Sequence, residues 1–273
     1  MSNDLRPLSL GELLDRSFFL YRKNFILFAG IMALPNLVLL AFQLAGVGVQ
    51  RWEGVRAGLL WTLATYVLTL GVTAASQGAT VIAVSRVHLG RHTSIGESFA
   101  GIKGRIISLA LIMIGLGIGV GIGLVLLIVP GVILALMWAL TIPVAVIEDK
   151  GLSDSVSRSA ELTKGHRGRV FVIYLLFTVL LWAIYMAWMF PITFIVGFNA
   201  ARGHHVAVMP LWTQIAFPVG TFVSQCLAGP LMTIGLSLLY YDERVRKEAF
   251  DLEHMMATLD GTTPGGIVPA VGV

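Results

Sequence analysis

Charged residues are scarce in this chain. Asp, Glu, Lys and Arg make up 12% of its 273 residues, and hydrophobic residues make up 56%. Because a soluble domain carries about 25% charged residues, this scarcity excludes an ordinary soluble protein. The formal net charge of +4 would suggest nucleic acid as the partner of a soluble protein. In a membrane protein, basic residues mark the cytoplasmic side instead, so we expect no nucleic-acid partner.

Cysteine is almost absent, and the usual metal-ligand patterns are missing. The single Cys226 excludes a disulfide framework and a thiolate metal cluster. His204 and His205 are adjacent and have no Asp, Glu or Cys nearby, whereas metal ligands are usually spaced along the chain so that they converge. We therefore predict no metal site and no cofactor.

The chain also lacks the sequence patterns of an enzyme. It has no Gly-rich phosphate loop, and Glu148, Asp149 and Glu161 have no His, Ser or Cys at a recognisable triad spacing. Ionisable residues inside the membrane, the usual mark of an ion pathway, are missing too. We expect a protein without enzymatic activity; the alternative is a membrane-embedded hydrolase, which needs carboxylates or His clustered at the inner surface.

Long apolar runs dominate what the chain does contain. A bilayer crossing takes about 20 apolar residues as helix, and five runs longer than this carry no Asp, Glu, Lys or Arg. The run 106–147 is long enough for two crossings. The sequence therefore predicts an all-α polytopic membrane helix bundle, with one domain at 1–253 and a flexible tail at 254–273. The expected transmembrane helices are 26–48, 58–85, 106–129, 131–147, 170–197 and 211–241.

Lys and Arg predict the orientation of these spans. Sixteen of the 19 basic residues fall in alternate segments between the spans, which by the positive-inside rule places both termini in the cytoplasm. The first apolar run has no small-residue cleavage site after it, so we expect no removable signal peptide. The predicted location is the inner membrane.

The fourth span is the least regular one. Pro130 and Gly131 lie where the chain has to turn between the third and fourth helices, so we predict a hairpin turn there. The fourth helix, 131–147, is short for a crossing and contains Pro143. A re-entrant hairpin therefore remains open as the alternative to a full crossing.

Amphipathic cytoplasmic helices are expected before three of the spans. Ser9 with Glu12, and Ser94 with Glu97, have the spacing of capping boxes, which start helices. The segment 152–169 is also helix-like, with Ser153 and Asp154 as candidate N-caps. The hypothesis is three sequential units, each a surface helix followed by a transmembrane hairpin. A chance occurrence of amphipathic segments is the alternative.

Small and polar residues inside the spans suggest how the helices pack. The third span has a glycine at every second position, which gives two opposite faces of small residues and predicts a helix enclosed between two others; a flexible or pore-lining helix is the alternative. Ser76-Gln77 and Ser224-Gln225 repeat one dipeptide, by coincidence, by internal repetition or because they form a shared polar patch. The glycines are Gly115, Gly117, Gly119, Gly121 and Gly123.

A basic cluster precedes the fifth span. Arg158, Lys164, Arg167 and Arg169 are candidates for binding lipid headgroups, since such juxtamembrane clusters attract anionic lipid. A topology signal without a shaped site is the alternative. Arg158 is also three residues from Glu161, which allows an ion pair along the helix.

Several stretches of the chain resemble a known family. They are 8–15, 21–25, 129–132, 158–165 and 240–248. On these stretches the sequence is similar to bacterial six-helix proteins described as the membrane domain of glycerophosphoryl diester phosphodiesterase, over about residues 7 to 254. The resemblance implies an inner-membrane protein whose family takes its name from members fused to a phosphodiesterase. It does not imply that activity here, because the catalytic barrel is a separate domain of about 250 residues.

Taken together, these patterns predict a non-enzymatic membrane protein. We expect it to act at the cytoplasmic leaflet as a lipid-contacting or partner-organising module. Its expected partners are membrane lipids, anionic ones above all, and a protein partner or a second copy. The alternative is a transporter or flippase-like carrier for an uncharged or lipidic solute. A polar cavity reaching midway through the bilayer favours the carrier, and a solidly packed centre favours the accessory role.

Overall fold

The computed structural model describes residues 8–52, 55–202 and 210–259. Within these residues the chain is all-α, as predicted. Six segments are long and apolar enough to cross a membrane, and they lie close to the six predicted spans. The prediction of a polytopic helical membrane bundle is therefore confirmed.

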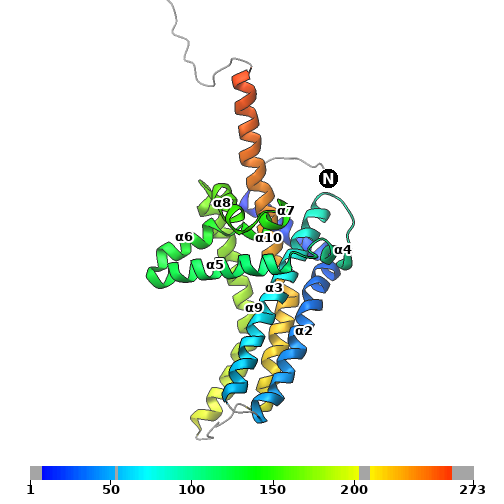
Figure 1. Cartoon of the computed structure of the whole chain (residues 1–273), viewed down its shortest axis with the longest axis vertical. Helices are drawn as coiled ribbons and strands as arrows, with labels where there is room; N and C mark the ends of the chain where they lie inside the picture. The colour runs from blue at the N-terminus through cyan, green and yellow to red at the C-terminus, as the bar shows by residue number, and fades with distance from the viewer. Residues whose placement is uncertain (1–7, 53–54, 203–209, 260–273) are drawn as a thin grey trace, which may run out of the picture.

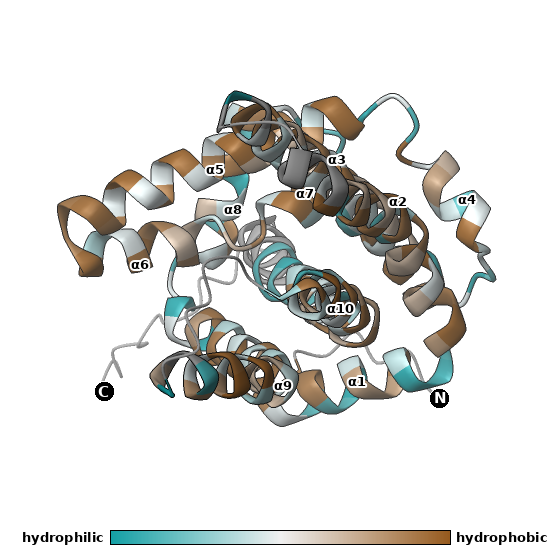
Figure 2. Ribbon diagram, turned by 90° about the horizontal axis from the view of Figure 1, so that it is seen from below, coloured by the Kyte–Doolittle hydropathy of each residue, from teal (hydrophilic) through white to brown (hydrophobic). Residues whose placement is uncertain are grey.

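Four long helices form an upright bundle. They are α2 (Phe25–Trp52), α3 (Val55–His88), α9 (Arg167–Ala201) and α10 (Leu211–Leu259), and they run side by side along the long axis of the molecule (Figure 1). Seen along that axis, α10 lies in the middle, between α3, α2 and α9 (Figure 2). Helix α10 is therefore the helix against which α2, α3 and α9 pack.

Three surface helices lie at one end of this bundle, at the positions that the sequence predicts. They are α1 (Leu10–Lys23), α4 (Ile95–Ala100) and α8 (Leu152–Thr163). We call this end, where α1, α4 and α8 lie, the α1 end (Figure 1).

Both predicted capping boxes are present. In α1 the Ser9 hydroxyl accepts from the Glu12 amide at 3.2 Å, and the Glu12 carboxylate accepts from the Ser9 amide at 2.7 Å. Ser94 and Glu97 make the same pair of bonds at the start of α4. The N-cap of α8 is different from our prediction, because the helix begins at Leu152, directly after the extended Gly151. Ser153 and Asp154 therefore lie inside its first turn.

The hairpin between the third and fourth predicted spans turns earlier than expected. Helix α5 (Ile106–Leu126) and helix α6 (Ile128–Met137) meet at the extended residue Leu127, so the turn is not at Pro130 and Gly131. Pro130 lies in the first turn of α6, where a missing amide hydrogen costs no helix hydrogen bond. Gly131 is buried in α6 and lies against Leu124 of α5.

The predicted fourth span consists of two short helices. α6 ends at Met137, a turn follows, and α7 (Thr141–Ile147) begins with Pro143 in its first turn. In Figure 1, α5 and α6 run across the upright bundle near the α1 end. This arrangement favours the re-entrant alternative over a full crossing for this hairpin. Its tip is strongly apolar and exposed, with 87% of Val125 accessible.

The alternating glycines of α5 pack on one face only. A side chain at Gly115 would contact Leu152, one at Gly119 would meet the Trp138 ring, and one at Gly123 would lie 2.9 Å from the Gly131 backbone. Gly117 and Gly121 have nothing within 4 Å. The expectation that α5 is enclosed on both faces is therefore wrong, because the hairpin projects from the bundle and leaves its second face open (Figure 2).

The hydrophobic core joins the bundle to the α1 end. Leu13 of α1, Phe28 of α2, Phe177 of α9 and Tyr240 of α10 are almost completely buried in one cluster. Helix α10 continues to Leu259, so the chain is still helical beyond residue 253, where the tail was predicted to begin. The rest of the predicted tail, and His204 and His205, lie outside the described residues.

The close contact of α5 with α6 gives a test of the hairpin. We expect Gly123→Ala to lower the free energy of unfolding by about 1–3 kcal/mol, because the new methyl group meets backbone that cannot move cheaply. Gly121→Ala, two residues along the same helix, is the matched control and should raise stability by up to about 1 kcal/mol. Thermal unfolding in detergent measures both; equal shifts would contradict the close contact.

Candidate functional site

The four basic residues that we predicted to bind headgroups fall into two groups, those with and those without an ion pair. Arg158 lies 2.6 Å from Glu248, 3.4 Å from Glu148 and 3.6 Å from Glu161, so the predicted pair with Glu161 is present. Arg169 is also bound inside the protein. Lys164 and Arg167 have no ion pair among the described residues, and they are the two members still available to a headgroup.

Arg169 belongs to a cluster around the buried Asp242 of α10. Its guanidinium lies 2.6 Å from the Asp242 carboxylate and donates to the backbone oxygen of Leu8 at 2.8 Å. Arg246, four residues along α10, contacts the same two groups, at 2.9 Å and 2.6 Å. The Leu8 amide donates to Asp242 at 2.6 Å. This Asp242 cluster fixes the segment before α1 and the start of α9 to α10.

Glu243, beside it, is fully buried. His166 lies 2.8 Å from one of its carboxylate oxygens, and Arg169 lies 3.8 Å from the other. Neither oxygen has a partner with hydrogen-bond geometry, so these are ion contacts without aligned bonds. Lys247, four residues after Glu243, donates to the backbone oxygens of Glu161 and Lys164 instead of pairing with Glu243.

A second ion cluster surrounds Glu148, directly after α7. Its carboxylate contacts Lys150 at 2.6 Å and Arg158 at 3.4 Å, and it accepts from the Tyr240 hydroxyl at 2.8 Å. Burial raises the pKa of Glu148, but the hydrogen bonds from Lys150 and Tyr240 and the charge of Arg158 outweigh burial and hold that pKa below its ordinary value of 4.5. Glu148 is therefore an ionised structural residue at neutral pH.

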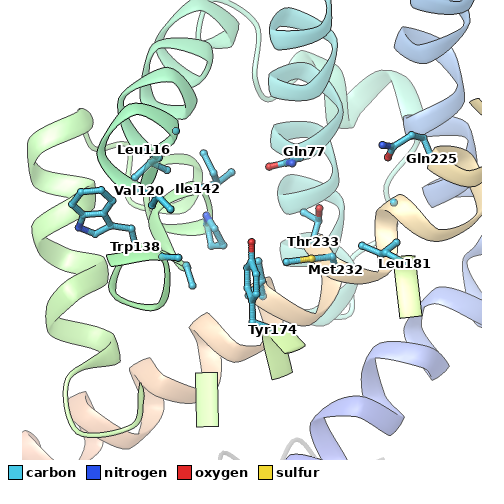
Figure 3. A pocket seen from close by; sticks show the side chains of 16 residues that line it. Gln77, Leu116, Val120, Trp138, Ile142, Tyr174, Leu181, Gln225, Met232 and Thr233 are labelled. Carbon is cyan, nitrogen blue, oxygen red and sulfur yellow. The ribbon is translucent and has the colours of Figure 1, made fainter. Parts of the chain in front are cut away.

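A cavity of about 480 Å³ lies between the α5–α6 hairpin and the bundle. Residues of α3, α5, α6, α7, α9 and α10 line it, and none of these residues is Asp, Glu, Lys, Arg or His. Trp138, Ile142 and Leu116 form part of its apolar wall, as Figure 3 shows. The cavity is uncharged and for the most part apolar.

Four polar side chains converge on this cavity. They are Gln77 of α3, Tyr174 of α9, and Gln225 and Thr233 of α10, and Figure 3 shows the Tyr174 hydroxyl pointing into the space. Among the described residues, none of the four side chains makes a hydrogen bond to another protein group. Polar groups away from water are costly unless they are bonded, so these four are available to a bound molecule or to water.

The cavity starts near the α1 end and extends along α10 into the depth of the spans. By the rise of a helix, Thr233 is about 10 Å along α10 from Tyr240 of the ion clusters, and Gln225 is about 22 Å. A hydrocarbon core is about 30 Å thick, so its middle lies about 15 Å from its edge. With Tyr240 at that edge, the cavity extends past the middle of the membrane.

One sequence pattern agrees with the position of this cavity. The repeated Ser-Gln dipeptides place Gln77 and Gln225 on its wall, which agrees with the interpretation as a shared polar patch. The serines of these dipeptides do not line the cavity. Ser224 accepts from the Trp188 indole at 2.7 Å, and the Ser76 hydroxyl is buried without a partner among the described residues. Tyr174 and Thr233 had no recognisable pattern. The described residues contain no group of three His, Cys, Asp or Glu side chains that could hold a metal ion.

The fold and this site define a class of protein. The chain is a multi-pass helical membrane protein whose surface helices gather at one end and which has an uncharged cavity within the depth of its spans. The family model for the membrane domain of glycerophosphoryl diester phosphodiesterase matches residues 112–255. The chain belongs to this family, as its resemblance indicated. Comparisons with curated proteins and with solved structures give no match.

The Asp242 cluster can be tested by removing its charge. Breaking a buried ion pair costs about 3–5 kcal/mol, because the remaining partner stays buried without compensation. We expect Asp242→Asn to lower the free energy of unfolding by this amount. Arg86→Gln, which breaks the more exposed pair of Arg86 with Glu97, should cost no more than about 1 kcal/mol. Thermal unfolding in detergent compares the two; similar losses would contradict a supporting role for Asp242.

Glu148 should make the stability of the folded protein depend on pH in the acidic range. Because its pKa lies below 4.5, the carboxylate stabilises the folded state above that pH, and this stabilisation is lost as the pH falls through the folded pKa. We expect Glu148→Gln to reduce the fall in unfolding temperature between about pH 5 and about pH 3. Asp154→Asn, at an exposed carboxyl, should leave that fall unchanged; an identical profile in both variants would refute the role of Glu148.

Proposed function

We propose that this membrane protein is a non-enzymatic, lipid-contacting module of the cytoplasmic leaflet, which holds one uncharged amphiphile in its lateral cavity. The observation that supports the proposal most is the convergence of Gln77, Tyr174, Gln225 and Thr233, without protein partners, on an apolar cavity.

The chemistry of the cavity limits what it can bind. A charged group would be desolvated there without a counter-ion, which is costly. Amide, hydroxyl and phenol groups can instead donate to and accept from the esters, amides or hydroxyls of an uncharged amphiphile. The apolar wall of Trp138, Ile142 and Leu116 suits its hydrocarbon part. This combination is typical of pockets for small apolar ligands with a few polar groups.

The proposed leaflet follows from the basic residues. Sixteen of the 19 Lys and Arg fall in the segments that we assign to the cytoplasm, and the surface helices among those segments lie at the α1 end. In this proposal the termini therefore lie on the cytoplasmic side of an inner membrane, and the cavity begins in the cytoplasmic half of that membrane. Lys164 and Arg167 are the residues of the basic cluster that we propose for contact with anionic headgroups there.

A carrier is the second candidate. The cavity extends past the middle of the bilayer to Gln225, and a cavity that reaches the middle of the bilayer favours movement of an uncharged or lipidic solute. The centre of the bundle, however, is filled by the buried side chains of the core around Phe28, Phe177 and Ile234. We therefore place the accessory role first and keep the carrier as the alternative. A partner protein or a second copy is a further proposal, for which the extension of α10 beyond the bundle offers a surface.

Catalysis is not part of the proposal. The three carboxylates considered for a hydrolase all contact basic residues. Glu148 lies within ion-pair distance of Lys150 and Arg158 and accepts a hydrogen bond from Tyr240. Asp149 lies 2.5 Å from Arg105. Glu161, the third, lies 3.6 Å from Arg158. Phosphodiesterase activity of the purified protein that is abolished by changing these carboxylates would overturn this part of the proposal.

The test is native mass spectrometry of the full chain, released from its own membrane in nanodiscs. We expect one uncharged amphiphile bound at stoichiometric amount. The double variant Gln77→Leu/Gln225→Leu should retain about thirtyfold less of it, because two hydrogen bonds of about 1 kcal/mol each are lost. Gln43→Leu, a glutamine of α2 that does not line this cavity, is the matched control and should retain it fully.

Two other results would change the conclusion. If all bound lipid exchanges freely and the double variant behaves like the control, the cavity is not a binding site and the proposal fails. If the wild type moves a fluorescent lipid between the leaflets of liposomes and the double variant does not, the carrier becomes the better description.

A further inference from the structure

A second cavity lies at the α1 end, outside the site described above. It has a volume of about 820 Å³ and is formed by one face of α1 and by the end of α3. The α1 residues that line it recur at the spacing of a single helical face. They are Glu12, Asp15, Arg16, Phe19, Leu20 and Lys23.

This cavity differs from the ion clusters in that three of its charged side chains are unpaired within the described part of the chain. Arg158, Arg169, Arg244 and Arg246 all contact carboxylates of the protein. Arg16, Lys23 and Asp15, in contrast, have no ion pair there, whereas Glu12 accepts from the Ser9 amide. The Lys23 ammonium lies 6.0 Å from the centroid of the Phe19 ring.

His88 also lines this cavity. Its ring stacks on Tyr241 at 5.1 Å, and the Tyr241 hydroxyl donates to Ser85 at 2.8 Å. Its Nδ1 atom is buried and has no hydrogen-bond partner among the described residues. Because Nδ1 is covered, it is not a contact atom for a ligand of the cavity.

The charges are ordered along α1. Asp15 lies toward the beginning of the helix, Arg16 follows it, and Lys23 lies about 12 Å farther along from Asp15 at its end. The apolar Phe19 and Leu89, which are 51% and 56% exposed, lie in the same wall. A ligand that fits has a cation for Asp15, an anion for Arg16 and Lys23, and an apolar part.

We infer that this cavity binds the headgroup of a zwitterionic phospholipid, with its phosphodiester at Arg16 and Lys23 and its ammonium group at Asp15. The phosphate accepts from the guanidinium and ammonium donors, and the apolar residues contact the start of the acyl chains. A lipid with an anionic headgroup satisfies the basic residues, but its negative charge repels Asp15 and it offers no cation to offset this repulsion. The site therefore distinguishes between two lipids of equal acyl chains, and it is independent of the cavity in the proposed function.

The test uses native mass spectrometry of the full chain in detergent, with equal amounts of palmitoyl-oleoyl phosphatidylethanolamine and phosphatidylglycerol as probes. We expect the wild type to retain the ethanolamine lipid about fivefold more than the glycerol lipid, since a charge contact near the surface has about that effect. Asp15→Asn should abolish this preference while leaving both lipids bound. Arg16→Gln should reduce retention of both lipids about fivefold.

Arg22→Gln is the matched control, because Arg22 is an exposed arginine on the same helix that does not line the cavity. It should leave retention and preference unchanged. If Arg22→Gln loses as much bound lipid as Arg16→Gln, or if Asp15→Asn keeps the preference for the ethanolamine lipid, the binding is non-specific charge attraction and the proposed site is refuted. Displacement of the lipid by soluble phosphoethanolamine would assign the cavity to a free phosphoester and overturn the lipid assignment. In each case the amphiphile held at Gln77 and Gln225 is measured separately, so the two proposals can fail independently.

Discussion

The burial of Asp242 is the constraint on which the arrangement of the α1 end depends. A carboxylate removed from water is stable only when its charge is compensated and its oxygens are bonded. Arg169 at the start of α9, Arg246 on α10 and the Leu8 amide together meet this requirement. Because these groups come from separate segments, satisfying one charge sets the position of α9 and of the entry into α1 relative to α10.

Paired and unpaired polar groups separate the scaffold of this protein from its candidate sites. Around Asp242 and Glu148, nearly every charge has a partner within the chain. In the lateral cavity, the side chains of Gln77, Tyr174, Gln225 and Thr233 have no hydrogen-bond partner among the described residues. A membrane protein gains little from burying apolar surface against itself, since lipid is equally apolar. Polar groups left without partners therefore point to a ligand more clearly in this setting than an apolar surface does.

The elements that could be predicted from sequence are those encoded by short-range patterns. The capping boxes at Ser9 and Ser94 require residues only three apart, and the charge-free runs need only length, so both were predictable. The turn at Leu127 was not, because Pro130 fits equally well inside the first turn of a helix as in a loop. The crosswise direction of the α5–α6 hairpin depends on packing with elements distant in sequence, such as α5 on α3, which no local pattern reveals.

The candidate sites were less predictable still. Arg158 and Arg169 looked like headgroup ligands because their acidic partners, Glu248 and Asp242, lie far away along the chain. Tyr174 and Thr233 are unremarkable residues within apolar helices, and only the fold brings them beside Gln77. Sequence reasoning found the glutamines through a repeated dipeptide. It had no means of finding the space between them.

The crosswise α5–α6 hairpin makes the molecule wider near the α1 end than at its other end (Figure 1). Inserted upright, such a body displaces more lipid area from one monolayer than from the other. A curved bilayer that has the wider end of the protein on its convex side relieves this difference in lateral packing. The protein is therefore cone-shaped with respect to the membrane, and the elastic energy of its surroundings depends on the local curvature.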